Sequence, residues 1–138
     1  MGRIMGIDMG DSRIGIALSD PLGLTAQGLT VIENKGRKQT LQAIGELIKN
    51  NEVDLVVMGM PFNMNGTEGP MAEKVRRVGQ SIKQVHKVEV KFQDERMTTV
   101  SAEQVLIQSG MTREKRRGVV DRIAATIILQ AYLDRKGE

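Results

Sequence analysis

Hydrophobic residues near the start of the chain form short runs that are separated by polar turns. Two apolar runs, at 4–9 and 14–18, flank a polar turn at 10–12, and this pattern predicts a β-hairpin. A third strand pattern spans 25–32 and is clearest over 29–32. Three consecutive strands with short connections predict an antiparallel meander.

The rest of the chain alternates between helical and strand periodicity. The expected elements are a helix at 37–50, a strand at 54–58, a helix from 70, a strand at 88–92, a helix after Thr98 or Thr99 that ends at Gly110, and a long helix marked by 119–132. The order is βββαβαβαα, and strands separated by helices pair in parallel. The order predicts an α/β fold of the ribonuclease H-like (RNase H-like) pattern, a five-stranded mixed sheet with helices on both faces.

The composition suits one domain over residues 1–138, because 40% hydrophobic residues in 138 are enough for a core. Aromatic residues make up only 2%, so we expect an aliphatic core. The absence of cysteine excludes disulfides and thiolate chemistry. No window is long and apolar enough to cross a membrane and no signal-peptide pattern opens the chain, so we expect a cytoplasmic protein with no membrane partner.

The net charge of +3 is unevenly distributed. Residues 1–69 carry more acidic than basic side chains, whereas residues 70–138 carry a clear basic excess that includes the run 113–117. Positive charge at a helix N-terminus opposes the helix dipole, which favours an anionic partner such as a nucleic-acid backbone. A solvated helix surface is the simpler alternative on charge alone. The scarcity of aromatic residues argues against a base-stacking platform.

One carboxylate interrupts the first apolar run. Asp8 is costly inside a strand unless it is paired, hydrogen-bonded or bound to metal. In the expected sheet the first strand is central, Asp94 and Glu95 end the last strand, and Asp121 lies on the final helix with small alanines one turn further on. Carboxylates that approach one another repel, and Mg²⁺ or Mn²⁺ relieves that repulsion. We therefore expect these acids to form one site.

Each of these residues also has a structural interpretation. Asp8 could stabilise the turn that follows it, the pair at 94–95 could be ordinary loop charges, and Asp121 could be a surface charge. The loop 59–67 precedes a helix, so its backbone amides and asparagines could hold a phosphate, or it could simply be a turn. The only histidine, His86, is expected to be exposed and without a partner.

Four blocks of sequence, taken in order, resemble the YqgF/RuvX family of Holliday junction resolvases and pre-16S rRNA nucleases, and the resemblance covers essentially the whole chain. It implies an RNase H-like fold, catalytic acids at Asp8, Glu95, Asp121 and Asp94, and one or two Mg²⁺ or Mn²⁺ ions held by the first three. Glu95 is preferred over Asp94, because strand alternation directs Asp94 to the face of Val88 and Val90. The blocks are 6–20, 59–66, 94–99 and 115–125.

The resemblance further implies hydrolysis of phosphodiester bonds in structured nucleic acid, leaving 5′-phosphate and 3′-hydroxyl ends. The expected partner is precursor rRNA, cut near the 5′ end of 16S rRNA, with branched four-way DNA as the alternative. Cleavage of a four-way junction requires a dimer, and the sequence is compatible with a monomer or a homodimer. The residues expected to bind nucleic acid are Arg13, Asn63, Asn65, Arg96, Arg113, Lys115, Arg116 and Arg117.

Two other functions stay open at this level. The chain could bind nucleic acid without cleaving it and use its acids structurally. It could also be related to ATP-binding domains, because residues 8–10 before a hairpin resemble the opening of sugar kinases and chaperones. Those enzymes pair two such domains around a nucleotide, and the length of this chain suits only one.

Overall fold

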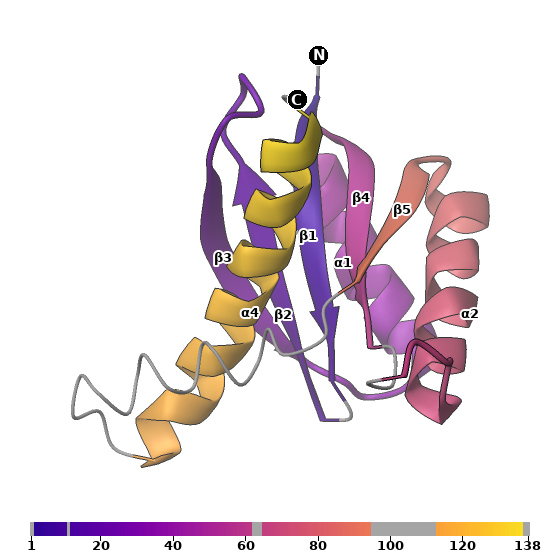
Figure 1. The fold of residues 1–138 in the computed structure, drawn as a ribbon. Coiled ribbons are helices and arrows are strands. Elements are labelled where there is room, and N and C mark those ends of the chain that lie inside the picture. The colour runs from indigo at the N-terminus through magenta and orange to yellow at the C-terminus, as the bar shows by residue number, and fades with distance from the viewer. Residues whose placement is uncertain (1, 11, 62–64, 95–112, 137–138) are drawn as a thin grey trace.

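The computed structural model describes residues 2–10, 12–61, 65–94 and 113–136, with side chains from 121 to 135 in the last range. Five strands form one sheet, and three helices of the described ranges cover it (Figure 1). The elements are β1 (Arg3–Met9), β2 (Arg13–Ser19), β3 (Ala26–Glu33), α1 (Arg37–Asn50), β4 (Val53–Met60), α2 (Pro70–His86), β5 (Glu89–Asp94) and α4 (Arg113–Lys136). None of these helices is long and apolar enough to cross a bilayer.

The sheet is mixed, as the sequence pattern predicts. Its strand order is β3-β2-β1-β4-β5, so β1 lies at the centre. The meander β1-β2-β3 is antiparallel, whereas β4 and β5 are added in parallel through α1 and α2. Parallel neighbours require a long crossover, and a helix supplies it. The predicted five-stranded mixed sheet is confirmed.

The helices lie on both faces of the sheet, with α1 and α2 on one side and α4 on the other (Figure 1). Alternation along β1 divides its side chains between these faces. Met5, Ile7 and Met9 belong to the core under α1 and α2. Ile4 belongs to the core under α4. Residue 8 shares the parity of residue 4, so the side chain of Asp8 is on the α4 face.

The core under α1 and α2 is filled by large aliphatic side chains. Met58 and Met60 from β4, Ile44 from α1 and Ile82 from α2 are all fully buried. Burial of each such side chain contributes about 1.5–3 kcal/mol to stability. His86 also belongs to this layer, because its Nε2 lies 2.8 Å from the carbonyl oxygen of Leu41 on α1. The expectation that His86 is exposed and unpartnered is therefore wrong.

The core under α4 contains small residues where the helix crosses β1 and β2. Ala17 and Ala125 are fully buried there beside Leu129. A Cβ added to Gly6 would lie 2.7 Å from the Cβ of Leu129, and one added to Gly15 would overlap the carbonyl oxygen of Asp121. Real Cβ atoms do not approach so closely, so the two glycines allow α4 to pack against the sheet backbone.

The boundaries differ from the predicted ones at two places. Strand β4 continues to Met60 and so includes the first two residues of the expected loop 59–67. Helix α4 begins at Arg113, which places the backbone of the basic run 113–117 in its first turns. The helix expected between Thr98 and Gly110 lies outside the described residues. Pro70 occupies the first turn of α2, where its missing N–H is no disadvantage.

Candidate active site

Asp8 lies near the carboxyl end of the central strand and is half-buried. Its cross-strand partner in β2 is Gly15. On its other side lies β4, where Ile7 pairs with Met58. The two strands are parallel, so the β4 residue next to Asp8 is Gly59. These two neighbouring glycines place no side chain beside the Asp8 carboxylate on the α4 face. Ligands of α/β sheets gather at this end of the strands.

Asp121 is brought to the same place by helix packing. Asp121, Ala125 and Leu129 form a row at intervals of four along α4, so they share one face of the helix. That row runs over the sheet, because the backbone of Ala125 meets Gly6 and the backbone of Asp121 meets Gly15. Cross-strand partners have Cα atoms about 4.5–5.5 Å apart, so Asp121 lies beside the strand position of Asp8.

Arg13 forms a salt bridge with Asp121. The Arg13 Nε donates a hydrogen bond to Asp121 Oδ2 at 2.6 Å, and the two side chains are 35% and 19% exposed. The sequence pattern predicts nucleic-acid binding for Arg13 but not this contact, because the partners are 108 positions apart. The available signal was strand alternation, which places Arg13, Gly15 and Ala17 on one face of β2.

Asp94 lies on the opposite side of the sheet from Asp8. Its partner in β4 is Met60, which belongs to the core under α1 and α2. Two residues earlier, the ring of Phe92 contacts Gly79 of α2. Register and alternation thus agree that Asp94 is directed away from the α4 face. Glu95 and Arg96 lie outside the described residues.

The described acids supply part of a ligand set for Mg²⁺ or Mn²⁺. These ions prefer carboxylate and other oxygen ligands, and Asp8 and Asp121 supply two carboxylates at one end of the sheet. Among the described residues, no group of three His, Cys, Asp or Glu side chains is placed to hold an ion. A third protein ligand would therefore come from the rest of the chain. Glu95, the candidate that the sequence offers for this role, lies outside the described residues.

The residues expected to bind nucleic acid are only partly described. Asn65 Oδ1 accepts hydrogen bonds from the backbone N–H and the hydroxyl of Thr67, at 3.1 and 2.6 Å, so this side chain stabilises its own loop. Asn63 lies outside the described residues. The backbone of Arg113, Lys115, Arg116 and Arg117 is helical. Helix α4 extends beyond the sheet at this end (Figure 1).

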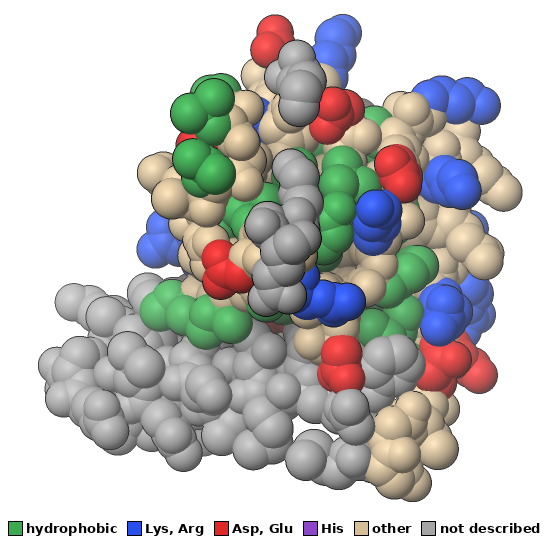
Figure 2. Space-filling view, turned by 45° about the horizontal axis from the view of Figure 1, so that its top comes forward, with side chains coloured by type: hydrophobic (Ala, Val, Ile, Leu, Met, Phe, Trp, Pro, Cys, Tyr) green, Lys and Arg blue, Asp and Glu red, His purple; other side chains and the backbone are tan. Residues whose placement is uncertain are grey.

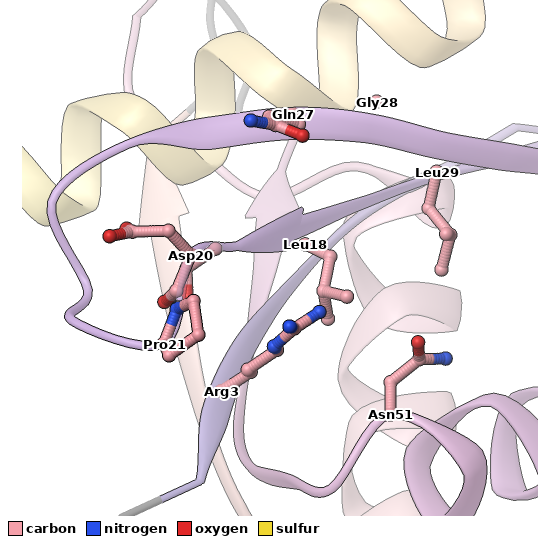
Figure 3. Close-up of a pocket in the computed structure, with 9 residues that line it drawn as sticks. Arg3, Leu18, Asp20, Pro21, Gln27, Gly28, Leu29 and Asn51 are labelled. Atoms are coloured by element: carbon pink, nitrogen blue, oxygen red, sulfur yellow. Dashed lines mark hydrogen bonds between the residues drawn. The ribbon is translucent and has the colours of Figure 1, made fainter.

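The opposite end of the sheet holds a pocket of about 330 Å³ (Figure 3). Arg3 and Asn51 approach it from β1 and from the end of α1, and Asp20 lies at its β2 side. The Asp20 carboxylate accepts hydrogen bonds from the amides of Leu24 and Thr25, at 2.7 and 2.8 Å. The Thr25 amide lowers the pKa of Asp20 most strongly. Asp20 thus stabilises the β2–β3 turn and lies at the far end of the sheet from Asp8.

The fold is similar to that of Holliday junction resolvases of known structure. The structure resembles the fowlpox virus Holliday junction resolvase in complex with junction DNA, with a TM-score of 0.61 at 15% identity over 99% of both chains. It also resembles Thermus thermophilus RuvC in complex with a Holliday junction, with a TM-score of 0.56 at 18% identity over 99% of this chain and 97% of that one. At such identities the likeness concerns the fold alone, and it confirms the RNase H-like prediction.

Sequence comparison then gives the family. The model of the RuvX family, described as "Holliday junction resolvase", matches residues 2–135. A Clostridium botulinum protein named "Putative pre-16S rRNA nuclease" is 49% identical over 132 residues, 96% of both chains. A protein of the same name from Clostridioides difficile is 47% identical over 135 residues, 98% of this chain and 96% of the other. The chain belongs to the RuvX family, and the resemblance found in its sequence is confirmed.

Proposed function

We propose that this protein is a metal-dependent endonuclease that hydrolyses phosphodiester bonds of structured nucleic acid, with the 5′ end of precursor 16S rRNA as its substrate. One observation carries the proposal. Asp8 on the central strand lies opposite Gly15, and the backbone of Asp121 packs on that glycine. Two carboxylates of distant sequence positions are thus held at the end of the sheet where ligands of α/β proteins bind.

Asp8, Glu95 and Asp121 would hold one or two Mg²⁺ or Mn²⁺ ions. When bound, such an ion lowers the pKa of a coordinated water and offsets the negative charge that develops on the phosphoryl oxygens. The protein contributes the geometry. Gly15 fixes how far α4 stands from the sheet. Asp94 is the weaker ligand candidate of the 94–95 pair, because it is directed to the face of the sheet opposite α4.

Arg13 would have two tasks in this site. Its Nε holds the Asp121 carboxylate at 2.6 Å and so fixes the orientation of a ligand. A guanidinium carries five N–H donors, so others remain to contact a substrate phosphate. The basic run 113–117 and Arg96 would add further phosphate contacts, which position the strand without reading its sequence.

RNA is favoured as the substrate because both relatives are named as pre-16S rRNA nucleases. Processing of an rRNA precursor would place the protein in the cytoplasm. Branched DNA is the second candidate, because the family is described as Holliday junction resolvases and two proteins of the same fold were solved with junctions. A four-way junction has two strands to cut, so that activity would need a homodimer, whereas a monomer is enough for the rRNA.

Cleavage assays test the proposal. Labelled fragments spanning the 5′ end of 16S rRNA, and four-way junctions, are incubated with the protein in Mg²⁺, Mn²⁺ or EDTA. We expect metal-dependent cuts in the RNA that are abolished by Asp8→Asn, whose side chain has nearly the same shape. Glu46→Gln is the matched control, because it neutralises an exposed carboxylate on α1. Binding without metal-dependent cleavage, or equal cleavage by Asp8→Asn, would contradict the proposal.

A further inference from the structure

A basic pocket of about 240 Å³ lies on the α1 and α2 side of the sheet. Arg37 from the start of α1 and Lys74 and Arg77 from α2 line it, together with Asn34 and Met9. We propose that this pocket binds a backbone phosphate of the nucleic-acid substrate, a second anchoring point that lies behind the catalytic acids. The inference rests on the proposed function for the identity of the ligand and on the pocket itself for its chemistry.

The pocket and the candidate active site share one end of the central strand. Met9 lines the pocket and directly follows Asp8. Successive residues of a strand point to opposite faces, so the acid and the pocket lie back to back across the sheet. A nucleic-acid strand bound at Asp8 would therefore reach the pocket by passing around the end of the sheet.

The described lining of the pocket gathers positive charge. Its lining contains no Asp or Glu. Among the described residues, no carboxylate forms a salt bridge with any of its three cations. The adjacent Arg76 behaves differently, because its Nε lies 2.5 Å from Glu68 Oε1. Three cations around one cavity repel one another, and an anion bound between them would relieve that repulsion.

Hydrogen bonds organise the walls of the pocket. Arg37 Nη2 donates to the hydroxyl of Ser81 on α2 at 2.5 Å, which holds the guanidinium across the gap between the helices. Asn34 Oδ1 accepts a hydrogen bond from the hydroxyl of Thr40 at 3.3 Å. The Asn34 amide in turn donates to the carbonyl oxygen of Gly10 at 3.1 Å. The pocket is therefore tied to the turn that follows Asp8.

The lining indicates which kind of phosphate would bind. Guanidinium and ammonium groups recognise phosphate oxygens, and Arg37 and Arg77 offer the forked donors that suit them. No aromatic residue lines the pocket, so it lacks the surface on which a base would stack. Lys and Arg side chains are also numerous over the side of the molecule on which α2 lies (Figure 2). These features favour the sugar–phosphate backbone of a polynucleotide over a free nucleotide.

The test compares two double variants of the full-length chain. Lys74→Gln with Arg77→Gln removes two pocket charges, and Lys49→Gln with Lys83→Gln removes two charges from the far ends of the same pair of helices. All four side chains are exposed, so both proteins should fold, and their melting temperatures check this. Binding of a labelled precursor rRNA hairpin is measured by fluorescence anisotropy in EDTA, at several salt concentrations between 50 and 200 mM.

We expect the pocket variant to bind about tenfold more weakly than the control variant at 100 mM salt, with a salt slope reduced by about 1–2. Equal binding by the two double variants would overturn the pocket assignment and leave the nuclease proposal intact. Conversely, a wild-type chain that binds the RNA but does not cleave it with Mg²⁺ would overturn the nuclease proposal and leave the pocket proposal intact. Absence of RNA binding by the wild-type chain would overturn both.

A second measurement separates a backbone phosphate from a small phosphate compound. Inorganic pyrophosphate is titrated into ¹⁵N-labelled protein, and the amide shifts of Asn34, Thr40 and Lys74 are followed. Saturable shifts that disappear in the pocket variant, together with its weaker RNA binding, support the proposal. Saturable pyrophosphate shifts without any difference in RNA binding would overturn it in favour of a small-molecule ligand.

Discussion

The two faces of the sheet are packed in different ways. Under α1 and α2 the sheet carries large buried side chains such as Ile7 and Met58, and the helices stand on them. Under α4 the equivalent positions are Gly6, Gly15 and Ala17, and the helix backbone approaches the strands directly. A side chain as short as aspartate reaches from helix to strand only across the second kind of interface. The face under α4, called the thin face below, therefore carries the candidate site. The face under α1 and α2 is called the thick face.

The comparison also explains how the basic groups divide between the faces. On the thin face, Arg13 is paired with Asp121. On the thick face, Arg37, Lys74 and Arg77 surround a cavity without acidic lining. The same end of the sheet thus combines carboxylates suited to a cation on one side with cations suited to a phosphate on the other. Four variants, two of them with a matched control, would break or sharpen this contrast.

The largest effect is expected for Gly15→Ala. The added Cβ overlaps the backbone of Asp121, which cannot rotate aside as a flexible side chain would. We expect a loss of at least about 3 kcal/mol in the free energy of unfolding, at the upper end for overpacking, and loss of cleavage because α4 must move. Urea denaturation measures the first and the rRNA assay the second.

Gly28→Ala is the control for that variant. Gly28 also faces α4, but its added Cβ would lie 3.4 Å from the Cβ of Arg122 and the hydroxyl oxygen of Thr126, which is ordinary van der Waals contact. We expect a change of less than about 1 kcal/mol, and cleavage close to wild type. If Gly15→Ala were as stable and as active as Gly28→Ala, close packing of α4 would not be what forms the site.

On the thick face, Ile82→Ala should reduce stability while leaving the site intact. Ile82 belongs to α2 and is fully buried, and its truncation leaves a cavity that costs about 3 kcal/mol. The damage lies across the sheet from Asp8, so cleavage by the folded protein, measured at 15 °C, should stay within about twofold of wild type. Loss of cleavage comparable to that of Gly15→Ala would contradict the view that the site depends on the packing under α4 and not on the core under α1 and α2.

Arg13→Gln should have a smaller effect on stability and a distinctive response to metal. The bridge to Asp121 is partly exposed, so its loss costs about 1 kcal/mol or less. The carboxylate then lacks this cation, and Mg²⁺ should raise the melting temperature of the variant more than that of wild type. Arg76→Gln is the matched control, because it breaks a pair of similar length with Glu68, and Arg76 belongs to α2, on the opposite face of the sheet from α4. Equal Mg²⁺ responses in the two variants would count against metal binding by Asp121.

The smallest effect concerns Asp20, at the other end of the sheet. Backbone amides, chiefly that of Thr25, lower its pKa in the folded protein. A lowered folded-state pKa contributes stability above the unfolded value of about 3.9, and this is lost as the pH falls through the folded value. Asp20→Asn should therefore lower the melting temperature slightly at pH 7 and converge on wild type once the pH falls below the lowered pKa of Asp20. If the melting temperatures of the two proteins differed by the same amount at every pH, the backbone amides would not be acting on the charge of Asp20.

Much of the fold could be predicted from local patterns. The helix expected at 37–50 has those boundaries, and the strands at 54–58 and 88–92 were located to within two residues. Such elements are readable because burial on one face imposes a period of 2 or 3.6 on the sequence. The pattern also singled out Asp8, since a charge within an apolar strand stands out without any knowledge of its surroundings.

The sequence by itself determined the order of elements, the mixed sheet and the acids worth examining. Only the tertiary structure decided that Gly15 sets the distance of α4, that Arg13 pairs with Asp121, and that His86 joins α1 to α2. The basic pocket likewise draws its cations from two helices. The physical reason is that periodicity records which face of an element is buried, whereas strand register and helix–sheet distance result from the packing of residues far apart in the chain.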